Sequence, residues 1–334
     1  MRLLITLLTG SFLLSASVSF GASFDCKKAS TEFEHLICDN AELNKLDEDL
    51  GKAYKQKRDS LSKDGKDLLK KSQRNWLKFV QGACQKGFSY DQGRDINSKE
   101  DKALCVKNWY EWRISSLLRE PDTESRNALG SSILPLFEGE FRKDGEKYCS
   151  SYREVDVLDR VSSFNDYIKD TFFEQSCDDD LASHHFEEIT FVLDKVIGKR
   201  FVRATLNESF CCGAHPISGS SDYYFDLVVG RFLSFKDIFK GNWFDGVKAE
   251  ASKEYFNEWK EDHPDDVRDQ VQRILDQTPP EGDELFNWEL TEGGFKISGE
   301  WFSYAERSRD FHDISWSSVK GNLTPLGLML SGQP

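Results

Sequence analysis

The stretch Cys26-Lys-Lys-Ala-Ser-Thr-Glu-Phe-Glu-His-Leu-Ile-Cys38 places two cysteines close together near the start of the chain. A second pair, Cys84 and Cys105, follows some fifty residues later, and the chain contains no Cys-x-x-Cys. Because a leader-like segment precedes both pairs, we expect an oxidising compartment, where near-neighbour thiols form structural disulfides rather than zinc or redox sites. The cysteines therefore predict a disulfide-stapled N-terminal module and favour an interaction role over a metabolic one.

The first residues have the pattern of a secretory signal. Arg2 is a short positive region, Leu3 to Leu14 is largely apolar, and Ser19-Phe20-Gly21 offers the small residues that a signal peptidase reads. We expect cleavage after Gly21, or alternatively after Ala22. The apolar run is short for a membrane span, and the residues before Cys26 lack the small side chains that usually precede a lipidated cysteine. The expectation is a soluble periplasmic or secreted protein with no membrane insertion after cleavage of residues 1–21.

Charge is distributed unevenly along the 334 residues, whose formal net charge is -14. Residues 22–120 hold 20 Lys and Arg against 17 Asp and Glu, whereas residues 121–334 hold 23 against 41. An acidic surface argues against nucleic acid and anionic lipid as partners and favours cationic ones. Plain solubility is the alternative explanation of this acidity.

Residues 22–120 show helical patterning. Asp39 or Asn40 can cap a helix that begins at Ala41, and apolar residues then recur at helical spacing up to Leu61. After a break at 62–65, two further helices are predicted, the last from about Glu100 to Leu118. The apolar positions of these three helices are Leu43, Leu46, Leu50, Ala53, Tyr54, Leu68, Leu69, Trp76, Phe79, Val80, Leu104, Trp109, Trp112 and Leu117.

The remainder changes character after a polar linker at 121–129. Short β-rich runs occupy 189–193 and 201–205, and hairpins are predicted at 223–233 and 286–301, with turns at Gly230 and at Gly293-Gly294. Helical spacing occurs at 247–259 and 267–275. We predict an α+β protein of two domains: a small helical domain at 22–120, and a mixed or antiparallel sheet with helices at 130–334.

The N-terminal residues resemble a known family. The resemblance rests on Ser23-Phe24-Asp25-Cys26, Ala29-Ser30, Glu34, Ile37-Cys38, Leu43, Leu46-Asp47, Leu50, Tyr54, Gln73-Arg74-Asn75-Trp76, Cys84, Cys105 and Arg113. This pattern is similar to the N-terminal domain of LprI-type lysozyme inhibitors, a helical, disulfide-stapled envelope module. One departure is Val80, where a basic residue is common in the family.

The resemblance implies a disulfide pairing and a structural motif. Cys26–Cys38 would tie the N-terminal segment to the first helix, and Cys84–Cys105 would staple the second helix to the third; loops this short contribute roughly 3 kcal/mol each in the chain-entropy model. Trp76 at helical spacing is expected in the core. Two interpretations stay open for the charged motif residues, which form either a buried ion network or solvated surface charges: Glu34, Asp47, Arg74 and Arg113.

The C-terminal part carries a second resemblance. It rests on Cys212-Gly213-Ala214-His215-Pro216, Tyr224-Phe225-Asp226-Leu227, Gly230 to Phe235, Asp237-Ile238-Phe239, Phe286 to Leu290 and Gly294 to Ile297. This order is similar to the extracellular domain of RsiV-type anti-sigma factors and some peptidoglycan deacetylases, which in RsiV-type proteins binds lysozyme. We expect neither the anti-sigma segment nor the deacetylase domain of those proteins in this chain.

Catalytic and metal-binding patterns are weak. Cys149, Cys177, Cys211 and Cys212 are expected to form disulfides, and three pairings stay open. His184, His185 and His215 invite a zinc hypothesis, but an oxidising compartment competes for the thiols, and His215 is better explained as a turn residue. Acidic neighbours on loops seldom reach the carboxylate separation of a glycosidase. We therefore expect no catalytic residue, no metal and no cofactor.

A candidate binding loop follows the last predicted strand. It runs from Ser303 to Asp310 and offers Tyr304 as an aromatic anchor beside Glu306; a solvated connection is the alternative. Together with His215, these residues form the sequence-based binding site. The leading hypothesis is inhibition of lysozyme or another cationic cell-wall hydrolase by steric and electrostatic occlusion. The rival is an envelope module that binds peptidoglycan fragments without inhibitory activity.

Overall fold

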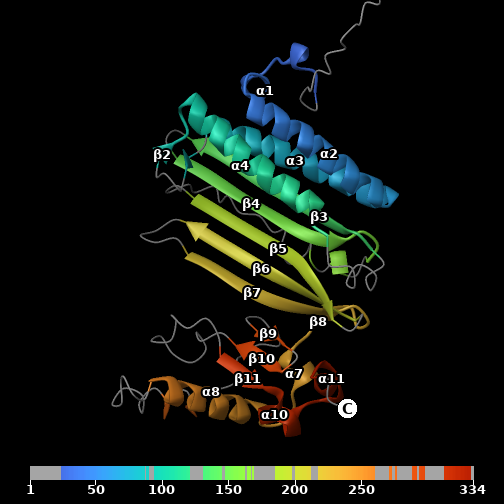
Figure 1. Cartoon of the computed structure of the whole chain (residues 1–334), viewed down its shortest axis with the longest axis vertical. Coiled ribbons are helices and arrows are strands. Elements are labelled where there is room, and N and C mark those ends of the chain that lie inside the picture. The colour runs from blue at the N-terminus through green and yellow to red at the C-terminus, as the bar shows by residue number, and fades with distance from the viewer. Residues whose placement is uncertain are drawn as a thin grey trace, which may run out of the picture.

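The computed structural model of the chain describes most of the mature sequence. The described residues are 24–86, 88–89, 94–120, 131–144, 147–161, 164–166, 168, 185–197, 200–211, 217–259, 271–272, 275–276, 288–291, 293–297 and 312–331. The expected signal peptide and its cleavage site lie outside them. Figure 1 shows the N-terminal helices at one end, a twisted sheet in the middle and a smaller group of elements at the other end.

The N-terminal part consists of helices joined by short connections. Asn40 accepts hydrogen bonds from the backbone N–H groups of Glu42 (2.9 Å) and Leu43 (3.2 Å), which explains why the long second helix begins at Ala41. The elements are η1 (Cys26–Lys28), α1 (Glu32–Cys38), α2 (Ala41–Ser60), α3 (Lys63–Lys86), β1 (Phe88–Ser89), β2 (Arg94–Asp95) and α4 (Lys99–Leu118).

The centre of the molecule is a mixed sheet in the order β3-β4-β5-β6-β7-β8. Its strands are β3 (Ile133–Asp144), β4 (Lys147–Leu158), β5 (His185–Ile197), β6 (Phe201–Cys211), β7 (Ile217–Asp226) and β8 (Arg231–Phe232). Only the β4–β5 pair within this described sheet is parallel. A parallel pair needs a crossover connection, and two buried residues of that crossover, Phe164 and Ile168, pack into the core. The predicted α+β class and mixed sheet are confirmed.

The C-terminal elements form a second core of their own. They are α7 (Phe235–Ile238), α8 (Trp243–Trp259), β9 (Trp288–Leu290), β10 (Gly294–Ile297), β11 (His312–Ser315), α10 (Trp316–Val319), η4 (Lys320–Asn322) and α11 (Pro325–Leu330). The three strands pair antiparallel in the order β11-β10-β9. Stacked rings of Phe239 and Trp243, with centroids 4.5 Å apart, lie in this core beside Phe295 and Trp316.

The helices and the six-stranded sheet share one continuous core. Phe79 of α3 lies 5.4 Å from the ring of Phe137 in β3 and 5.6 Å from that of Tyr152 in β4. Gly139 makes this approach possible, since a Cβ there would stand 2.8 Å from atoms of both Phe79 and Phe137. The predicted boundary at 121–129 lies outside the described residues and stays a prediction, but the packing on either side of it is continuous.

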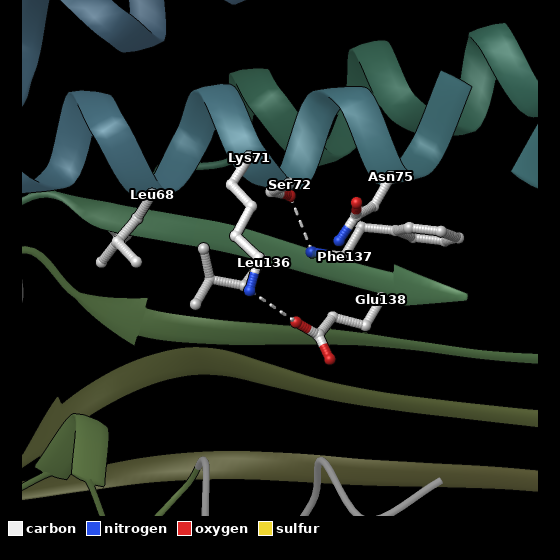
Figure 2. Close-up of a pocket in the computed structure, with 7 residues that line it drawn as sticks. All are labelled: Leu68, Lys71, Ser72, Asn75, Leu136, Phe137 and Glu138. Atoms are coloured by element: carbon white, nitrogen blue, oxygen red, sulfur yellow. Dashed lines mark hydrogen bonds and ion pairs between the residues drawn. The ribbon is translucent and has the colours of Figure 1, made fainter. Parts of the chain in front are cut away.

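Helix α3 also covers the outer edge of the sheet. The Ser72 hydroxyl accepts a hydrogen bond from the backbone N–H of Phe137 (2.7 Å) and lies 3.4 Å from the carbonyl of Pro135, to which it donates. Pro135 has no N–H to leave unpaired, which suits an edge strand. Figure 2 shows Ser72 above β3, beside a groove of about 300 Å³ whose mouth the Lys71–Glu138 ion pair crosses at 3.6 Å. An exposed edge that would invite pairing with another chain is thereby blocked.

Several predicted elements are confirmed. The helix starting at Ala41, the helix ending at Leu118 and the turn at Gly230, whose φ is 79°, stand as expected. The predicted break at 62–65 is shorter, because Gly65 already belongs to α3. Leu104 is 45% exposed and does not join the core. The predicted hairpin at 286–301 is present as the antiparallel pair β9–β10. The sequence did not indicate β3, β4, β11 or the short C-terminal helices, while the expected helix at 267–275 falls largely outside the described residues.

Candidate functional site

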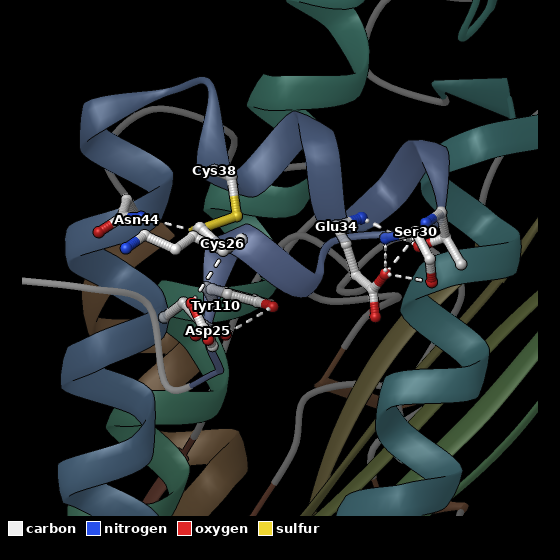
Figure 3. The surroundings of a disulfide bond; sticks show 10 residues. Asp25, Cys26, Ser30, Glu34, Cys38, Asn44 and Tyr110 are labelled. Atoms are coloured by element: carbon white, nitrogen blue, oxygen red, sulfur yellow. Dashed lines mark hydrogen bonds between the residues drawn. A yellow bond between two sulfur atoms is a disulfide. The ribbon is translucent and has the colours of Figure 1, made fainter.

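The N-terminal segment is held against the helices by a disulfide. Cys26 and Cys38 are bonded with their Cα atoms 5.7 Å apart, and the Asn44 amide donates to the Cys26 sulfur at 3.5 Å (Figure 3). Cys84–Cys105 joins α3 to α4 with a Cα separation of 5.5 Å. Both expected pairings are present, and each closes a short loop at the same end of the helical module.

Glu34 is a capping residue. Its carboxylate accepts hydrogen bonds from the backbone N–H groups of Ser30 (2.7 Å) and Thr31 (3.0 Å), while the Thr31 hydroxyl accepts one from the Glu34 N–H (Figure 3). This reciprocal arrangement is a capping box that starts α1. The donated hydrogen bonds, chiefly those from the Ser30 and Thr31 backbone, lower the pKa of the Glu34 carboxyl. Glu34 thus serves local structure.

The other motif residues separate into buried and exposed positions. Trp76 is fully buried, with its ring centroid 5.4 Å from that of Tyr110. Tyr110 donates a hydrogen bond to the buried Asp47 carboxylate at 3.2 Å, and burial raises the pKa of its hydroxyl. Arg74 lies exposed on α3. The expected core position of Trp76 agrees with the structure, whereas the four charged motif residues do not meet in one network.

Arg113 connects the helices to the sheet. Its guanidinium is fully buried and donates to Glu154 of β4 at 2.8 Å, to the Ser72 hydroxyl at 3.1 Å and to the Gln73 side-chain oxygen at 3.1 Å. Two further contacts of 3.5 Å reach the Pro135 carbonyl. A buried guanidinium needs such a complete set of acceptors. Of the two interpretations of the charged motif residues, Arg113 therefore follows the buried one.

A second arginine extends this buried charge cluster. Arg119 donates to the other Glu154 oxygen at 2.9 Å, and its Nη2 lies 3.4 Å from Asp156 Oδ1. The other Asp156 oxygen accepts from the Leu193 N–H at 3.0 Å. Burial raises the pKa of the Asp156 carboxyl to about 6, although Arg119 opposes that shift. These charges lie at the junction between α4 and β4, where Glu154 and Asp156 are buried and Arg119 is half-buried.

An exposed groove lies at the α1 end of the helical module. It has a volume of about 330 Å³, and its rim is crossed by ion pairs between Lys102 and Glu32 (2.7 Å) and between Lys99 and Asp39 (3.6 Å). Its lining residues are Glu32, His35, Leu36, Asp39, Gln85, Asn97, Lys99 and Lys102. The groove offers donors and acceptors of both signs to a partner, next to the two disulfides.

The sheet has one face that is only half covered. The helices pack over β3 and β4 on this face, where Trp109 lies 4.9 Å from Tyr152. Cross-strand pairing places the polar residues of β5, β6 and β7 beside one another on the same face, and we call this group the open face: Glu188, Thr190, Asn207, Ser209, Ser218 and Ser220. Most of this group, with Glu208 and Gly219, lines a shallow hollow of about 470 Å³.

Carboxylates surround the one arginine at the far end of this face. Arg203 donates to Asp194 at 2.9 Å and lies 3.5 Å from Glu289 and 3.8 Å from Asp222. Burial raises the pKa of the Asp222 carboxyl, while hydrogen bonding from Thr205 lowers it. Lys296 also lies 3.7 Å from Glu289, so three carboxylates and two cations leave a small negative local charge, which favours cationic partners.

The comparisons with known proteins bear on both parts of the chain. Residues 26–117 match the family model described as "Lysozyme inhibitor LprI". We call these residues the LprI domain, after the family that they match. Solved structures similar to the chain include DUF3298-family proteins of Pseudomonas aeruginosa (TM-score 0.43) and Bacteroides fragilis (TM-score 0.42). Each is 13% identical and covers 59% of this chain and 95% of its own. No curated protein matches the chain significantly.

The LprI domain and its disulfides together indicate an extracytoplasmic protein, since disulfides persist in oxidising compartments. The family's description implies a binding role rather than a catalytic one. Within the described part of the chain, no helix has the length and apolar character needed to cross a membrane. In the same ranges, no three His, Cys, Asp or Glu side chains are grouped so as to hold a metal ion.

The sequence-based binding residues lie outside the described residues: His215, Tyr304, Glu306 and Asp310. The same holds for Cys177 and Cys212, and for the side chain of Cys211. Cys149 is disulfide-bonded, but the choice among the three pairings stays open. The sequence reasoning missed the open face and the groove at α1. Alternating Ser, Asn and Thr in β6 and β7 was the available signal for the open face.

Proposed function

We propose that the protein binds and inhibits a lysozyme or another cationic muramidase. The observation that carries this proposal is the match of residues 26–117 to the LprI family, whose description names lysozyme inhibition. The geometry is consistent with it, because the motif residues of the LprI domain maintain the fold and leave the α1 groove exposed. An exposed, rigid surface next to two disulfides favours tight association, since little order is lost on binding.

The acidic remainder of the chain gives this proposal an electrostatic mechanism. Residues 121–334 carry 18 more acidic than basic side chains, and the Arg203 cluster shows carboxylates gathered beside the open face. Such a surface steers a cationic enzyme into encounter, at a rate that falls as salt screens the field. Occlusion of the substrate cleft would then be steric.

The proposal is tested by titrating the oxidised mature protein into a lysozyme lytic assay at low and at physiological salt. We expect stoichiometric inhibition that weakens with salt. Absence of inhibition at both salt concentrations, with a folded protein by circular dichroism, would refute the proposal. The next measurement in that case is retention on purified peptidoglycan, which tests the rival function.

Replacing polar and charged side chains by uncharged ones tests which surface of the protein contacts the enzyme. His35→Ala combined with Asn97→Ala alters the α1 groove without changing the ion pairs on its rim. Glu188→Gln alters the open face, and Asp245→Asn removes the same charge elsewhere. We expect the groove pair to weaken inhibition at both salt concentrations. If only the two charge-removing variants weaken it, and by equal amounts, general electrostatics rather than a local contact is responsible.

We also propose that the loop with Tyr304 and Glu306 enters the carbohydrate cleft of the enzyme. The support is its sequence alone, an aromatic anchor among mixed charges after a strand. A Tyr304→Ala, Glu306→Ala double variant should inhibit less strongly. Inhibition equal to that of the wild type would remove this loop from the mechanism while leaving the LprI domain's role intact.

A further inference from the structure

Helix α3 carries a line of cations along the side that faces solvent. Their spacing of three or four residues places them on one side of the helix, opposite the buried Leu69, Trp76 and Phe79. We call the following five residues the basic ridge: Lys63, Lys66, Lys70, Arg74 and Lys78. Within the described residues, none of the five forms an ion pair. At 1.5 Å per residue the ridge is roughly 22 Å long.

The neighbouring helices treat their cations differently. On α2, Lys45 pairs with Asp49 at 2.6 Å and Lys52 pairs with Glu48 at 2.8 Å. On α4, Lys107 pairs with Glu42 at 2.5 Å. The same module therefore neutralises several of its lysines with nearby carboxylates, whereas the five ridge cations, which follow one another along one side of α3, have no such partner among the described residues.

The sign of the ridge is opposite to that of the molecule. The chain has a net charge of -14, so its bulk field repels anionic surfaces and the sequence predicts no affinity for anionic lipid. Because the ridge is positive and the rest of the molecule is acidic, an anionic partner orients the protein with the ridge towards it and the acidic remainder away from it. Leu77 lies among these cations and is 39% exposed, which adds an apolar contact to the charged ones.

We propose that the basic ridge docks the protein onto a bilayer containing anionic phospholipid. Juxtaposed lysine and arginine side chains are attracted to such a surface additively, and an apolar side chain among them enters the headgroup region. The helix presents the five cations on one side, together with the exposed Asp67, which follows Lys63 by four residues and precedes Lys70 by three, so that a strip of net positive charge faces a flat surface. The extracytoplasmic location excludes nucleic acid as the usual polyanion, and Leu77 favours a lipid surface over a soluble polyanion. This function goes beyond lysozyme inhibition and uses residues that the proposed inhibitory surfaces do not.

The test is co-sedimentation of the full oxidised mature chain with vesicles of phosphatidylglycerol and phosphatidylcholine, against vesicles of phosphatidylcholine alone. We expect binding to the anionic vesicles only, with a loss of affinity between low and physiological salt. Removing three cations in Lys70→Gln, Arg74→Gln, Lys78→Gln should weaken binding roughly 100-fold. Failure of the wild-type chain to bind anionic vesicles would overturn the proposal.

The matched control removes three cations that are paired, as Lys45→Gln, Lys52→Gln, Lys107→Gln, and changes net charge equally. It should retain most of the binding. Equal losses in the two triple variants would show a net-charge effect and overturn the assignment to α3. Leu77→Ser should weaken vesicle binding without changing its salt dependence. Binding of soluble polyphosphate as tight as that of vesicles, with Leu77→Ser having no effect, would assign the ridge to a soluble polyanion instead.

Discussion

At the scale of single residues, two arginines of the same sequence pattern differ in burial and therefore in role. Arg74 and Arg113 both belong to the LprI pattern, yet Arg74 is exposed while Arg113 is fully buried against Glu154. The sequence could not distinguish them, because the acceptor of Arg113 lies 41 residues further along the chain in a different element. The role of Arg113 depends on its contact with a strand that is distant in sequence, and the local sequence pattern does not contain that contact.

The first prediction concerns this pair. Arg113→Ala should lower the free energy of unfolding by about 3–5 kcal/mol, because it leaves Glu154 with less compensation in a buried site. Arg74→Ala, the matched control on the exposed side of α3, should change it by less than about 0.5 kcal/mol. Urea unfolding of both oxidised variants measures the difference. Similar midpoints for the two variants would show that the Glu154 ion pair does not stabilise the junction.

Asp156 gives a prediction about pH. Burial raises its pKa in the native state to about 6, above the ordinary value of 3.8. The native state therefore holds this proton more tightly than the unfolded chain, and the contribution of Asp156 to stability falls as pH rises from about 4 to 6. Relative to the wild type, Asp156→Asn should gain stability across this window, by up to about 3 kcal/mol.

The measurement is the difference in urea midpoint between the wild type and the Asp156→Asn variant at pH 4 and at pH 7. Taking the difference cancels the other carboxylates, several of which respond in the opposite direction. Asp245→Asn, where the side chain is 68% exposed, serves as the control and should show no such pH trend. A pH-independent difference for Asp156→Asn would contradict the raised pKa.

At the scale of elements, the helices follow from sequence and two strands do not. The periodic apolar residues and the Asn40 cap predict α2 correctly, because the signals of a helix lie within its own sequence. In β4 the residues Arg153, Glu154 and Asp156 are buried charges, which remove the apolar alternation by which a strand is recognised. Their partners come from α4 and β5, so β4 could be predicted only once its neighbours were known. The open face was missed for the same reason, since the register of three strands brings its residues together.

Helix α3 begins after Ser62, whose hydroxyl caps the helix by accepting a hydrogen bond from the Gly65 N–H at 3.1 Å and is itself held by the sheet. Asp159, just after β4, accepts hydrogen bonds from the N–H and the hydroxyl of Ser62, both at 2.7 Å. Gly65 lies against this carboxylate, and a Cβ there would stand 1.9 Å from Asp159 Oδ1. Replacing glycine by alanine within a helix normally increases the free energy of unfolding by roughly 0.5–1 kcal/mol. At this position Gly65→Ala should instead destabilise the protein, because it displaces the cap.

A double-mutant cycle tests this interpretation of Gly65. In an Asp159→Ala background the obstructing carboxylate is absent, and Gly65→Ala should become neutral or stabilising as helix propensity dominates. Thermal or urea unfolding of the four proteins gives the coupling free energy. If Gly65→Ala lowers stability equally in both backgrounds, the tight packing against Leu61, whose Cβ would lie 3.2 Å away, is responsible and not the cap.

At the scale of the whole molecule, the LprI domain is bound to the rest of the chain by its core. The Ser62–Asp159 hydrogen bonds, the edge contact from Ser72 and the Arg113–Glu154 pair all cross the same junction. Composition and charge change near residue 120 and suggest two independent domains, but the apolar residues of α3 and α4 continue into the sheet. A change in sequence character thus marks a change in secondary structure without implying separate folding.

This continuity predicts the behaviour of a fragment spanning residues 22–120. Without the sheet, Phe79 and Trp109 lose Phe137 and Tyr152 as cover, and the Arg113 guanidinium loses its carboxylate. The two disulfides still restrict the unfolded chain, so the helices should persist by far-ultraviolet circular dichroism. The fragment should nevertheless bind a hydrophobic dye and unfold at a lower urea concentration than the full chain, both proteins being oxidised. A cooperative transition at the full chain's midpoint would instead show that the LprI domain is self-sufficient. In that case the contacts across the junction orient the two parts without stabilising the helices, and inhibition could be tested on the fragment alone.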